Sequence, residues 1–269
     1  MSSAIPRAQL ESRYDESAQA YLASLPLEHH MEAPPQATQR KITLESFDVL
    51  SLRRPEVHCF NELLVQYPYG RMEETKQVVP DNMIVLHDGP LEMGNSFAIE
   101  LQPEGPFLVL EYVSKSSKRK DYEGSFRKYE RELKVPYYLL FYPETQDLTL
   151  FRRNTRRYVS VKPNEADRLA ISELDLEVAL LDGWARYWYR GELLQLPGDL
   201  QMSLDESREQ TRRAELKASR AEEKASLAED KASRAEDRAR QAQGKEAEER
   251  LSKEKLLAQL RAMGVAPDL

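Results

Sequence analysis

Short apolar runs follow one another between about residue 57 and residue 200, and their β-branched and aromatic residues predict strands. The predicted strands are VHCFNELLVQY, QVVPDNMIVLH, FAIELQ, FLVLEYVS and PYYLLFYP. The last run is almost continuously apolar, which is typical of a strand covered on both faces. DLTLFRRNTRRYVSV predicts a hairpin that turns at Asn154 and Thr155, and WARYWYRGELLQL closes the globular part near Pro197.

Helical spacing appears at three places before residue 135. A short helix is expected over residues 8–25, ahead of the polar, proline-bearing EAPPQATQRK, and residues 1–40 are interpreted as an N-terminal extension. TLESFDVLSL, at 43–52, combines a helix start signal with apolar residues at rough helical spacing. Within residues 120–134, aromatic and leucine side chains recur at steps of four, three and four, which predicts a helix.

After about residue 201 the pattern becomes a heptad repeat. Alanine occupies positions 214, 218, 221, 225, 228, 232, 235, 239 and 242, and charged residues fill most of the positions between them. The repeat predicts a long helix over 201–269 that is interrupted at Gly244 and ends at Gly264 and Pro267. Such a helix can self-associate as a coiled coil, bind a partner, or stay solitary and exposed.

Composition supports this division into a globular part and a charged helix. The chain has 269 residues, of which 41% are hydrophobic and 32% charged, so one medium domain at 41–200 is expected beside the extension and the helix. The single cysteine, Cys59, excludes an intramolecular disulfide and a cysteine-rich zinc site. With no apparent signal peptide and no long apolar span, we expect a cytoplasmic protein that does not enter membranes.

Two acidic residues carry the candidate chemistry. Glu111 lies in the apolar run FLVLEYV, where a carboxylate is costly unless it caps the strand, pairs with a lysine or binds a metal. Asp81 follows Pro80 beside another predicted strand, a position that a simple turn carboxylate also occupies. Two carboxylates brought together from neighbouring strands would bind Mg²⁺ or Mn²⁺. Such a cation can polarise a phosphodiester and lower the pKa of an attacking water.

The order of these residues resembles the PD-(D/E)-x-K nuclease superfamily and, more narrowly, the Uma-type family of restriction endonucleases. The matching residues are Pro80-Asp81, Glu111-Tyr112-Val113-Ser114, Ser117, Asp121, Tyr129, Val135-Pro136-Tyr137-Tyr138 and Tyr142-Pro143. The resemblance covers about residues 40–200 and then the C-terminal tail.

The resemblance implies an α/β (α+β) fold, a restriction-endonuclease-like mixed sheet of four or five strands flanked by helices and followed by the long C-terminal helix. It places the acids on adjacent central strands, with Asp81 and Glu111 as metal ligands and the Tyr112 carbonyl as an additional ligand. The motif's lysine position is Val113 here, and the position that closer relatives use on the following helix is Ser125. The candidates for the catalytic lysine are therefore Lys128 and Lys115.

The charge distribution bears on the partner. The net charge of −7 does not favour nucleic acid overall, but residues 115–134 hold eight Lys/Arg against four Asp/Glu, and residues 152–168 hold six against two. The substrate-binding candidates in these clusters, which otherwise would be solvated faces, are Lys118, Arg119, Arg152 and Arg153. The sequence predicts an Mg²⁺-dependent endonuclease acting on DNA. The alternative is a catalytically inactive nuclease-fold protein that binds or scaffolds through its coiled coil.

Overall fold

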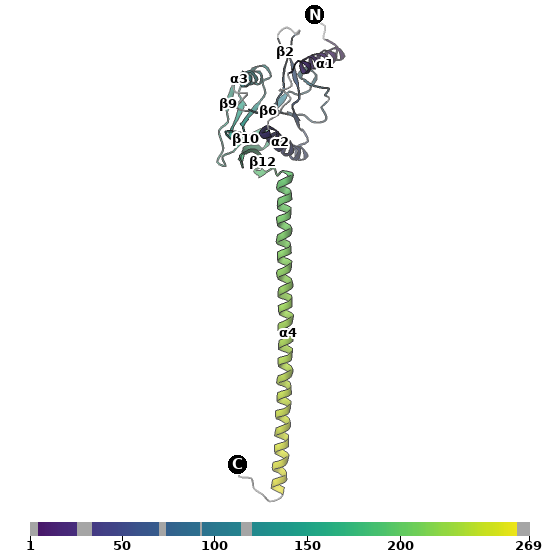
Figure 1. The fold of residues 1–269 in the computed structure, drawn as a ribbon, viewed down its shortest axis with the longest axis vertical. Helices are drawn as coiled ribbons and strands as arrows, with labels where there is room; N and C mark the ends of the chain where they lie inside the picture. Colours follow the sequence, from purple (N-terminus) through teal and green to yellow (C-terminus); the bar gives the residue numbers. More distant parts are fainter. Residues whose placement is uncertain (1–4, 26–33, 70–73, 92, 114–119, 263–269) are drawn as a thin grey trace. The chain divides into compact units, whose positions relative to one another are not determined.

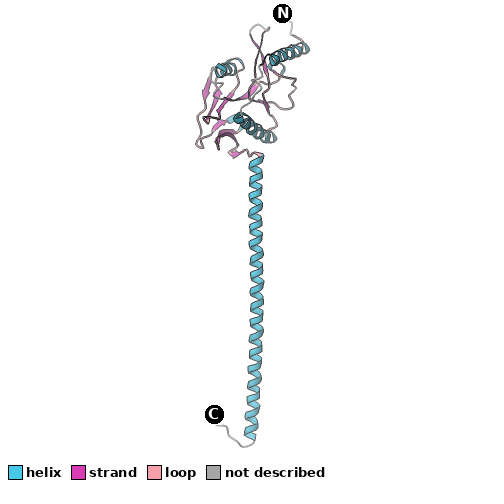
Figure 2. Ribbon diagram, in the orientation of Figure 1, coloured by secondary structure: helices cyan, strands magenta, loops and turns pink. Residues whose placement is uncertain are grey.

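The computed structural model describes residues 5–25, 34–69, 74–91, 93–113 and 120–262. The chain divides into two compact units, Met1–Leu200 and Gln201–Leu269 (Figure 1). The first unit combines helices with β-sheets, whereas the described residues of the second all belong to one long helix (Figure 2). The predicted fold class is therefore confirmed.

A six-stranded sheet forms the centre of the first unit. Its order is β1-β4-β6-β7-β8-β9, and these strands are β1 (Val57–Asn61), β4 (Asn82–Leu86), β6 (Pro106–Tyr112), β7 (Tyr137–Tyr142), β8 (Asp147–Arg153) and β9 (Tyr158–Ser160). Only β6 and β7 run parallel in it, so the sheet is mixed as expected. The expected four or five strands are too few, because the predicted hairpin contributes β8 and also the edge strand β9.

Two smaller sheets accompany the central one. The first has the order β3-β2-β5, from β2 (Val65–Tyr69), β3 (Glu74–Val78) and β5 (Phe97–Ala98). The second has the order β10-β11-β12-β13, from β10 (Leu169–Ile171), β11 (Leu176–Leu181), β12 (Trp184–Tyr189) and β13 (Glu192–Leu193). FAIELQ was expected to be a strand, but it leaves the sheet after Ala98 and forms the 3₁₀ turn η2 (Ile99–Leu101).

Two of the predicted strands are each broken in two. VHCFNELLVQY forms β1 and β2 in different sheets, and Glu62, between them, adopts a left-handed φ of 47° that a continuous strand does not allow. QVVPDNMIVLH forms β3 and β4, separated by Pro80, which has no N–H to donate to a ladder. The second break places Asp81 immediately before β4.

Two helices precede the strands. Helix α1 (Arg7–Ser24) confirms the helix expected over residues 8–25. Helix α2 (Pro34–Arg53) contains the predicted 43–52 segment but begins much earlier, since prolines are tolerated in a first helical turn. Its Gln39 is fully buried and bonds the N–H and the carbonyl of Ala185 with its amide. The boundary expected at residue 40 therefore falls inside α2.

The helix expected over 120–134 changes its winding midway. Helix α3 (Lys120–Arg127) continues into the π-helical turn η4 (Lys128–Glu132), where the Leu133 N–H donates to the Lys128 carbonyl at 2.9 Å. A π turn inserts one extra residue into the helical period and is common at functional sites. Because of the extra residue, the side chains of η4 point in other directions than they would if the α-helix continued through these positions.

Hydrophobic side chains cover both faces of the central sheet. One cluster joins Phe47 and Leu50 of α2 to alternate residues of β6 and β7 and to the β10–β13 sheet. The other joins the remaining residues of β6 and β7 to Tyr129 of η4 and to the β2–β3–β5 sheet. PYYLLFYP, which contains β7, is thus covered on both faces as predicted.

Helix α4 (Pro197–Ala262) is continuous for 66 residues and passes through Gly244, so the interruption expected there does not break it. Its first turn carries Asp199, which accepts the Leu196 N–H at 3.0 Å and pairs with the buried Arg186 of β12. Among the described helices, none combines the length and the apolar character that a membrane crossing requires.

Candidate active site

Asp81 and Glu111 meet because β4 and β6 are antiparallel neighbours. Asn82 of β4 lies opposite Leu110 of β6, so one further step along this register brings Asp81 opposite Glu111. The Asp81 Oδ2 also accepts the Tyr112 N–H at 2.6 Å, which ties the residue before β4 to the end of β6. The sequence predicted this pair of acids on adjacent central strands, and the topology brings them together.

The two carboxyl groups are strongly coupled. Burial and the nearby Asp81 carboxylate raise the pKa of Glu111 well above its ordinary value. The Tyr129 hydroxyl, from η4, donates to the Glu111 Oε1 at 2.6 Å and partly opposes the shift in pKa. Without a cation, the site therefore favours one negative charge over two.

Lys128 is the described lysine that the fold brings to this pair. It begins the π turn, is half-buried, and donates from Nζ to the Gln77 carbonyl of β3 at 2.9 Å. Its positive charge acts on Glu111 in the direction that lowers the pKa of that carboxyl. Of the two lysine candidates, Lys128 thus lies beside the acids, while Lys115 lies outside the described residues.

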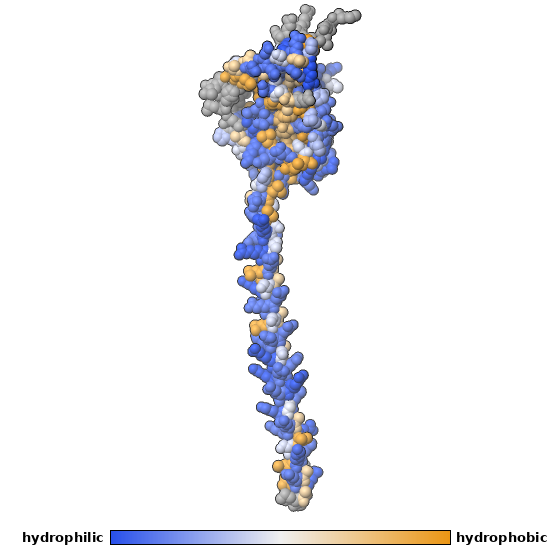
Figure 3. Space-filling view, turned by 90° about the vertical axis from the view of Figure 1, so that its right-hand side faces the viewer, coloured by the Kyte–Doolittle hydropathy of each residue, from blue (hydrophilic) through white to orange (hydrophobic). Residues whose placement is uncertain are grey.

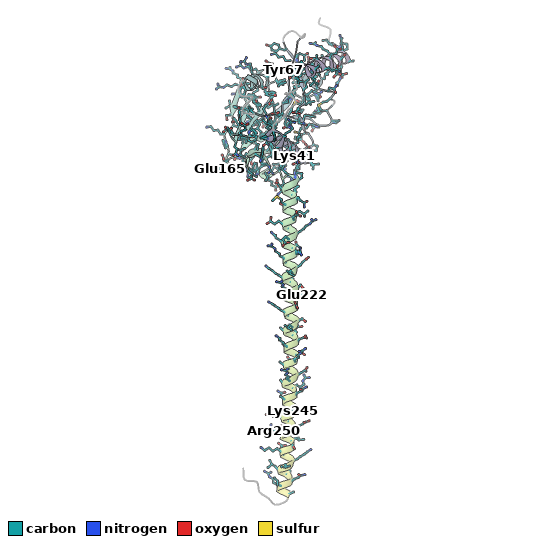
Figure 4. The ribbon with its side chains drawn as sticks, viewed as in Figure 1. Lys41, Tyr67, Glu165, Glu222, Lys245 and Arg250 are labelled. Atoms are coloured by element: carbon teal, nitrogen blue, oxygen red, sulfur yellow. The ribbon has the colours of Figure 1, made fainter. Side chains whose placement is uncertain are left out.

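A second set of contacts fixes the π turn from the other end. Glu132 accepts the Tyr67 hydroxyl at 2.7 Å and pairs with Lys76 Nζ at 2.9 Å; Tyr67 is labelled in Figure 4. Both partners come from the β2–β3 hairpin, and Lys76 also lies over the Tyr69 ring. The turn that carries Lys128 is therefore anchored to the same hairpin that accepts its ammonium group.

A buried polar network supports the acids from the opposite face of the sheet. The Tyr112 hydroxyl donates to the Asn82 Oδ1 at 2.6 Å and lies 2.7 Å from the Thr43 hydroxyl of α2. Thr43 in turn lies 3.0 Å from the Tyr187 hydroxyl of β12. Because Asn82 and Tyr112 are the neighbours of Asp81 and Glu111, the network links α2 and β12 to both strand ends that carry the acids.

Sequence reasoning did not identify Gln36 or Gln77 as neighbours of the site. The Gln36 Nε2, in the first turn of α2, donates to the Tyr112 carbonyl at 2.8 Å. This carbonyl is the expected additional metal ligand, and it keeps a second lone pair beside the Gln36 bond. A helix start at Pro34 would have brought Gln36 into consideration, but the proline-bearing segment was read as an extension.

Of the predicted substrate-binding arginines, the two that the structure describes, Arg152 and Arg153, bond to residues other than the acids and lie on opposite faces of the sheet. Arg152 pairs with Glu173 at 2.8 Å and is opposite Tyr137, whose side chain packs in the α2-side cluster. It therefore faces away from Glu111, which by alternation shares the η4 face with Val109. Arg153 lies on the η4 face and donates to the Glu130 carbonyl at 2.8 Å. The other two candidates, Lys118 and Arg119, lie outside the described residues.

The donor set fits a hard cation with few protein ligands. Among the described residues, no group of three or more His, Cys, Asp and Glu side chains could hold a metal. Zn²⁺ sites use three or four such ligands, whereas Mg²⁺ is commonly bound through one or two carboxylates and several waters. When both carboxyl groups are ionised, they offer a cation two negative charges. Asp81 and Glu111 thus fit Mg²⁺ or Mn²⁺.

Comparison with known proteins places the segment that contains these acids in a family. The model of the Uma2 family, described as "Putative restriction endonuclease", matches residues 29–182, a segment that contains Asp81, Glu111 and Lys128. One similar solved structure is described as "a putative nuclease belonging to DUF820" from Anabaena variabilis. It is 13% identical, with a TM-score of 0.41, over 54% of this chain and 75% of that one. No curated protein matches significantly. Since the matched segment is more than half of the chain, this protein belongs to the Uma2 family of nuclease-like proteins.

Proposed function

We propose that the first unit is a metal-dependent endonuclease that hydrolyses phosphodiester bonds in DNA. The observation that carries the proposal is the convergence of Asp81 and Glu111, with a lysine beside them, inside the segment that matches the family. A structural carboxylate pair would gain nothing from this arrangement, because each acid raises the cost of ionising the other.

Asp81 and Glu111 would hold the cation, Mg²⁺ or Mn²⁺. When bound there, the cation would polarise the phosphodiester and lower the pKa of the attacking water. The residues of the chain prepare this site: the Tyr112 N–H fixes one carboxylate of the pair, and the Tyr129 hydroxyl fixes the other. Fixed ligands would keep the site in shape while a cation binds.

Lys128 would stabilise negative charge that develops on the phosphate. Its Gln77 bond holds the ammonium group at the edge of the site, and its half-buried position lowers the dielectric screening of its charge. A fixed cation of this kind contributes most when it is already in place before the reaction. This role replaces the lysine that the motif would place at Val113.

DNA is the proposed substrate, and basic clusters would contact its backbone. The protein is acidic overall, so binding would depend on local contacts such as those of the Arg152–Arg157 hairpin and the 115–120 segment. Affinity supplied by phosphate contacts falls steeply as salt rises. We expect binding of a DNA duplex to weaken by at least tenfold between about 50 and 200 mM salt.

Cleavage of supercoiled plasmid DNA in the presence of Mg²⁺ or Mn²⁺ tests the proposal. Asp81→Asn and Glu111→Gln keep the size of each side chain and are expected to abolish cleavage. Glu165→Gln is the matched control, because Glu165 is an exposed carboxylate that belongs to neither the site nor its network (Figure 4). Absence of cleavage with either metal, together with no heat of metal binding in calorimetry, would instead support a non-catalytic nuclease-fold binding protein.

A further inference from the structure

Helix α4 carries one continuous heptad frame from Leu200 to Leu260. With Ala218 at position a and Ala221 at position d, the nine seam alanines from 214 to 242 all fall on a or d. Leu200 and Leu204 occupy the same seam before them, and Leu256 and Leu260 occupy it after them. In the single chain, none of the 66 helix residues is buried, and Figure 3 shows the helix covered mainly by hydrophilic residues.

The residues that flank the seam carry a uniform charge pattern. Position e is glutamate in four successive heptads, at Glu215, Glu222, Glu229 and Glu236, and position g is lysine or arginine, at Lys217, Lys224, Lys231 and Arg238. Figure 4 labels Glu222, one of these glutamates, on α4. Alanine buries little area, so the flanking charges have a large share in deciding how such a helix associates.

Most of these charges have no opposite charge within their own helix. The neighbours of Glu222 three and four residues away are alanine and serine on both sides, and the same is true of Glu229. For Lys224 and Lys231, the residues at these spacings are alanine, leucine or arginine. The ion pairs of α4 between its own residues instead lie before the repeat, at Asp205–Arg208 and Glu209–Arg213. The e and g charges are therefore available to a second helix.

We infer that two copies of this chain pair in parallel through the alanine heptads, residues 214–242. In a parallel pair, each g residue faces the e residue of the next heptad in the other copy, so Lys217 meets Glu222, and Lys224 meets Glu229. In an antiparallel pair, g faces g and e faces e, which sets cation against cation and carboxylate against carboxylate. On each side of the pair, three contacts (Lys217–Glu222, Lys224–Glu229 and Lys231–Glu236) are attractive in the first arrangement, whereas the second arrangement sets like charges against each other.

The same heptad frame fixes the register of the two copies and limits how far the pairing extends toward the C-terminus. Full overlap of the nine alanine layers brings the copies into register, which closes the assembly around a two-fold axis. Beyond Ala242 the next seam residues are Glu246 and Glu249, which in register oppose their own copies. The charged layers therefore end the alanine-mediated contact. This inference does not depend on the proposed nuclease activity.

Sedimentation of the full chain tests the pairing. We expect a concentration-dependent dimer, and we expect reversal of the four g charges (Lys217, Lys224, Lys231 and Arg238 to Glu) to weaken it at least tenfold. Adding the reciprocal change of the four e glutamates to Lys should restore the dimer. The control reverses the same number of charges at outward positions (Arg212, Arg220, Arg234 and Arg240 to Glu) and should leave the dimer intact. A wild-type chain that stays monomeric at about 100 μM, or a control that dissociates like the g variant, overturns the inference.

Disulfide cross-linking tests whether the two helices run parallel or antiparallel. In a Cys59→Ser background, Ala214→Cys and Ala242→Cys place a thiol near each end of the repeat, and circular dichroism checks that the variants keep their helix. A parallel pair in register cross-links each variant with itself under mild oxidation. An antiparallel pair fails to do so and cross-links only a mixture of the two variants. Self-linked products support the inference, and mixed products without them contradict it.

Discussion

Glu111 shows how much of the site can be explained from one residue. Its carboxyl group interrupts an apolar strand, the Tyr129 hydroxyl offsets part of the cost by donating to it, and burial beside Asp81 raises its pKa and so favours the neutral acid. Glu111→Gln imitates the neutral acid, so in metal-free buffer we expect an unfolding free energy at least as high as that of the wild type. The variant should lose the rise in melting temperature that Mg²⁺ gives the wild type. Thermal unfolding with and without Mg²⁺ measures both, and a variant still stabilised by Mg²⁺ would remove Glu111 from the ligand set.

Lys128 gives the second prediction at this scale. Its ammonium group donates to the backbone carbonyl of Gln77, a contact that leaves the positive charge of the lysine in place. Lys128→Gln should lower the rate of DNA cleavage by roughly 100-fold while leaving calorimetric Mg²⁺ binding unchanged. Lys41→Gln is the control, because Lys41 is exposed on α2 and is labelled in Figure 4. Equal losses of metal affinity and of rate would mean that Lys128 only shapes the metal site.

At the scale of elements, the first turn of α4 is tied to the β10–β13 sheet through Asp199 and Arg186. Burial alone would raise the pKa of Asp199, but the Leu196 N–H and the Arg186 guanidinium outweigh it and lower that pKa. Because this pKa is lower in the folded chain than in the unfolded chain, the ionised carboxylate stabilises the fold at pH values above the unfolded pKa of about 3.9. This stabilisation disappears as the pH falls through the pKa of the folded state. Asp199→Asn should therefore lower the free energy of unfolding by about 1–2 kcal/mol at pH 7. The loss is no larger because the Asp199 side chain is 36% exposed and water screens its charge. Urea unfolding from pH 7 to pH 3 should show the difference shrinking toward acid; a constant difference would contradict the pairing.

The elements also show what the sequence could predict. Strong local patterns predicted α1, β6, β7, the β8–β9 hairpin and the long helix, and the order of Pro80-Asp81 and Glu111 predicted the acid pair. The breaks at Glu62 and Pro80 were missed, because the apolar pattern is the same whether two consecutive strands belong to one sheet or to two different sheets. The π turn was missed for a similar reason, since its extra residue is stabilised by contacts from β2 and β3 that lie far away in sequence. Tertiary contacts thus position Lys128, whereas Lys115 lies outside the described residues.

At the scale of the whole molecule, the proposed nuclease and the proposed parallel helix pair make a joint prediction. A parallel pair joins two copies of the first unit to the same end of one assembly, and two active sites acting together can cut both strands of a duplex. Deleting residues 205–269 keeps Asp199 and its contact with Arg186, and it leaves the core clusters of the first unit complete. The truncated chain should still nick plasmid DNA at the wild-type rate per site, but conversion of nicked to linear plasmid should slow at least tenfold. The full-length chain with the four g charges reversed should behave in the same way, because it also lacks the pairing. Loss of nicking in a truncated chain that still unfolds cooperatively would show that the helix contributes to the chemistry rather than to association.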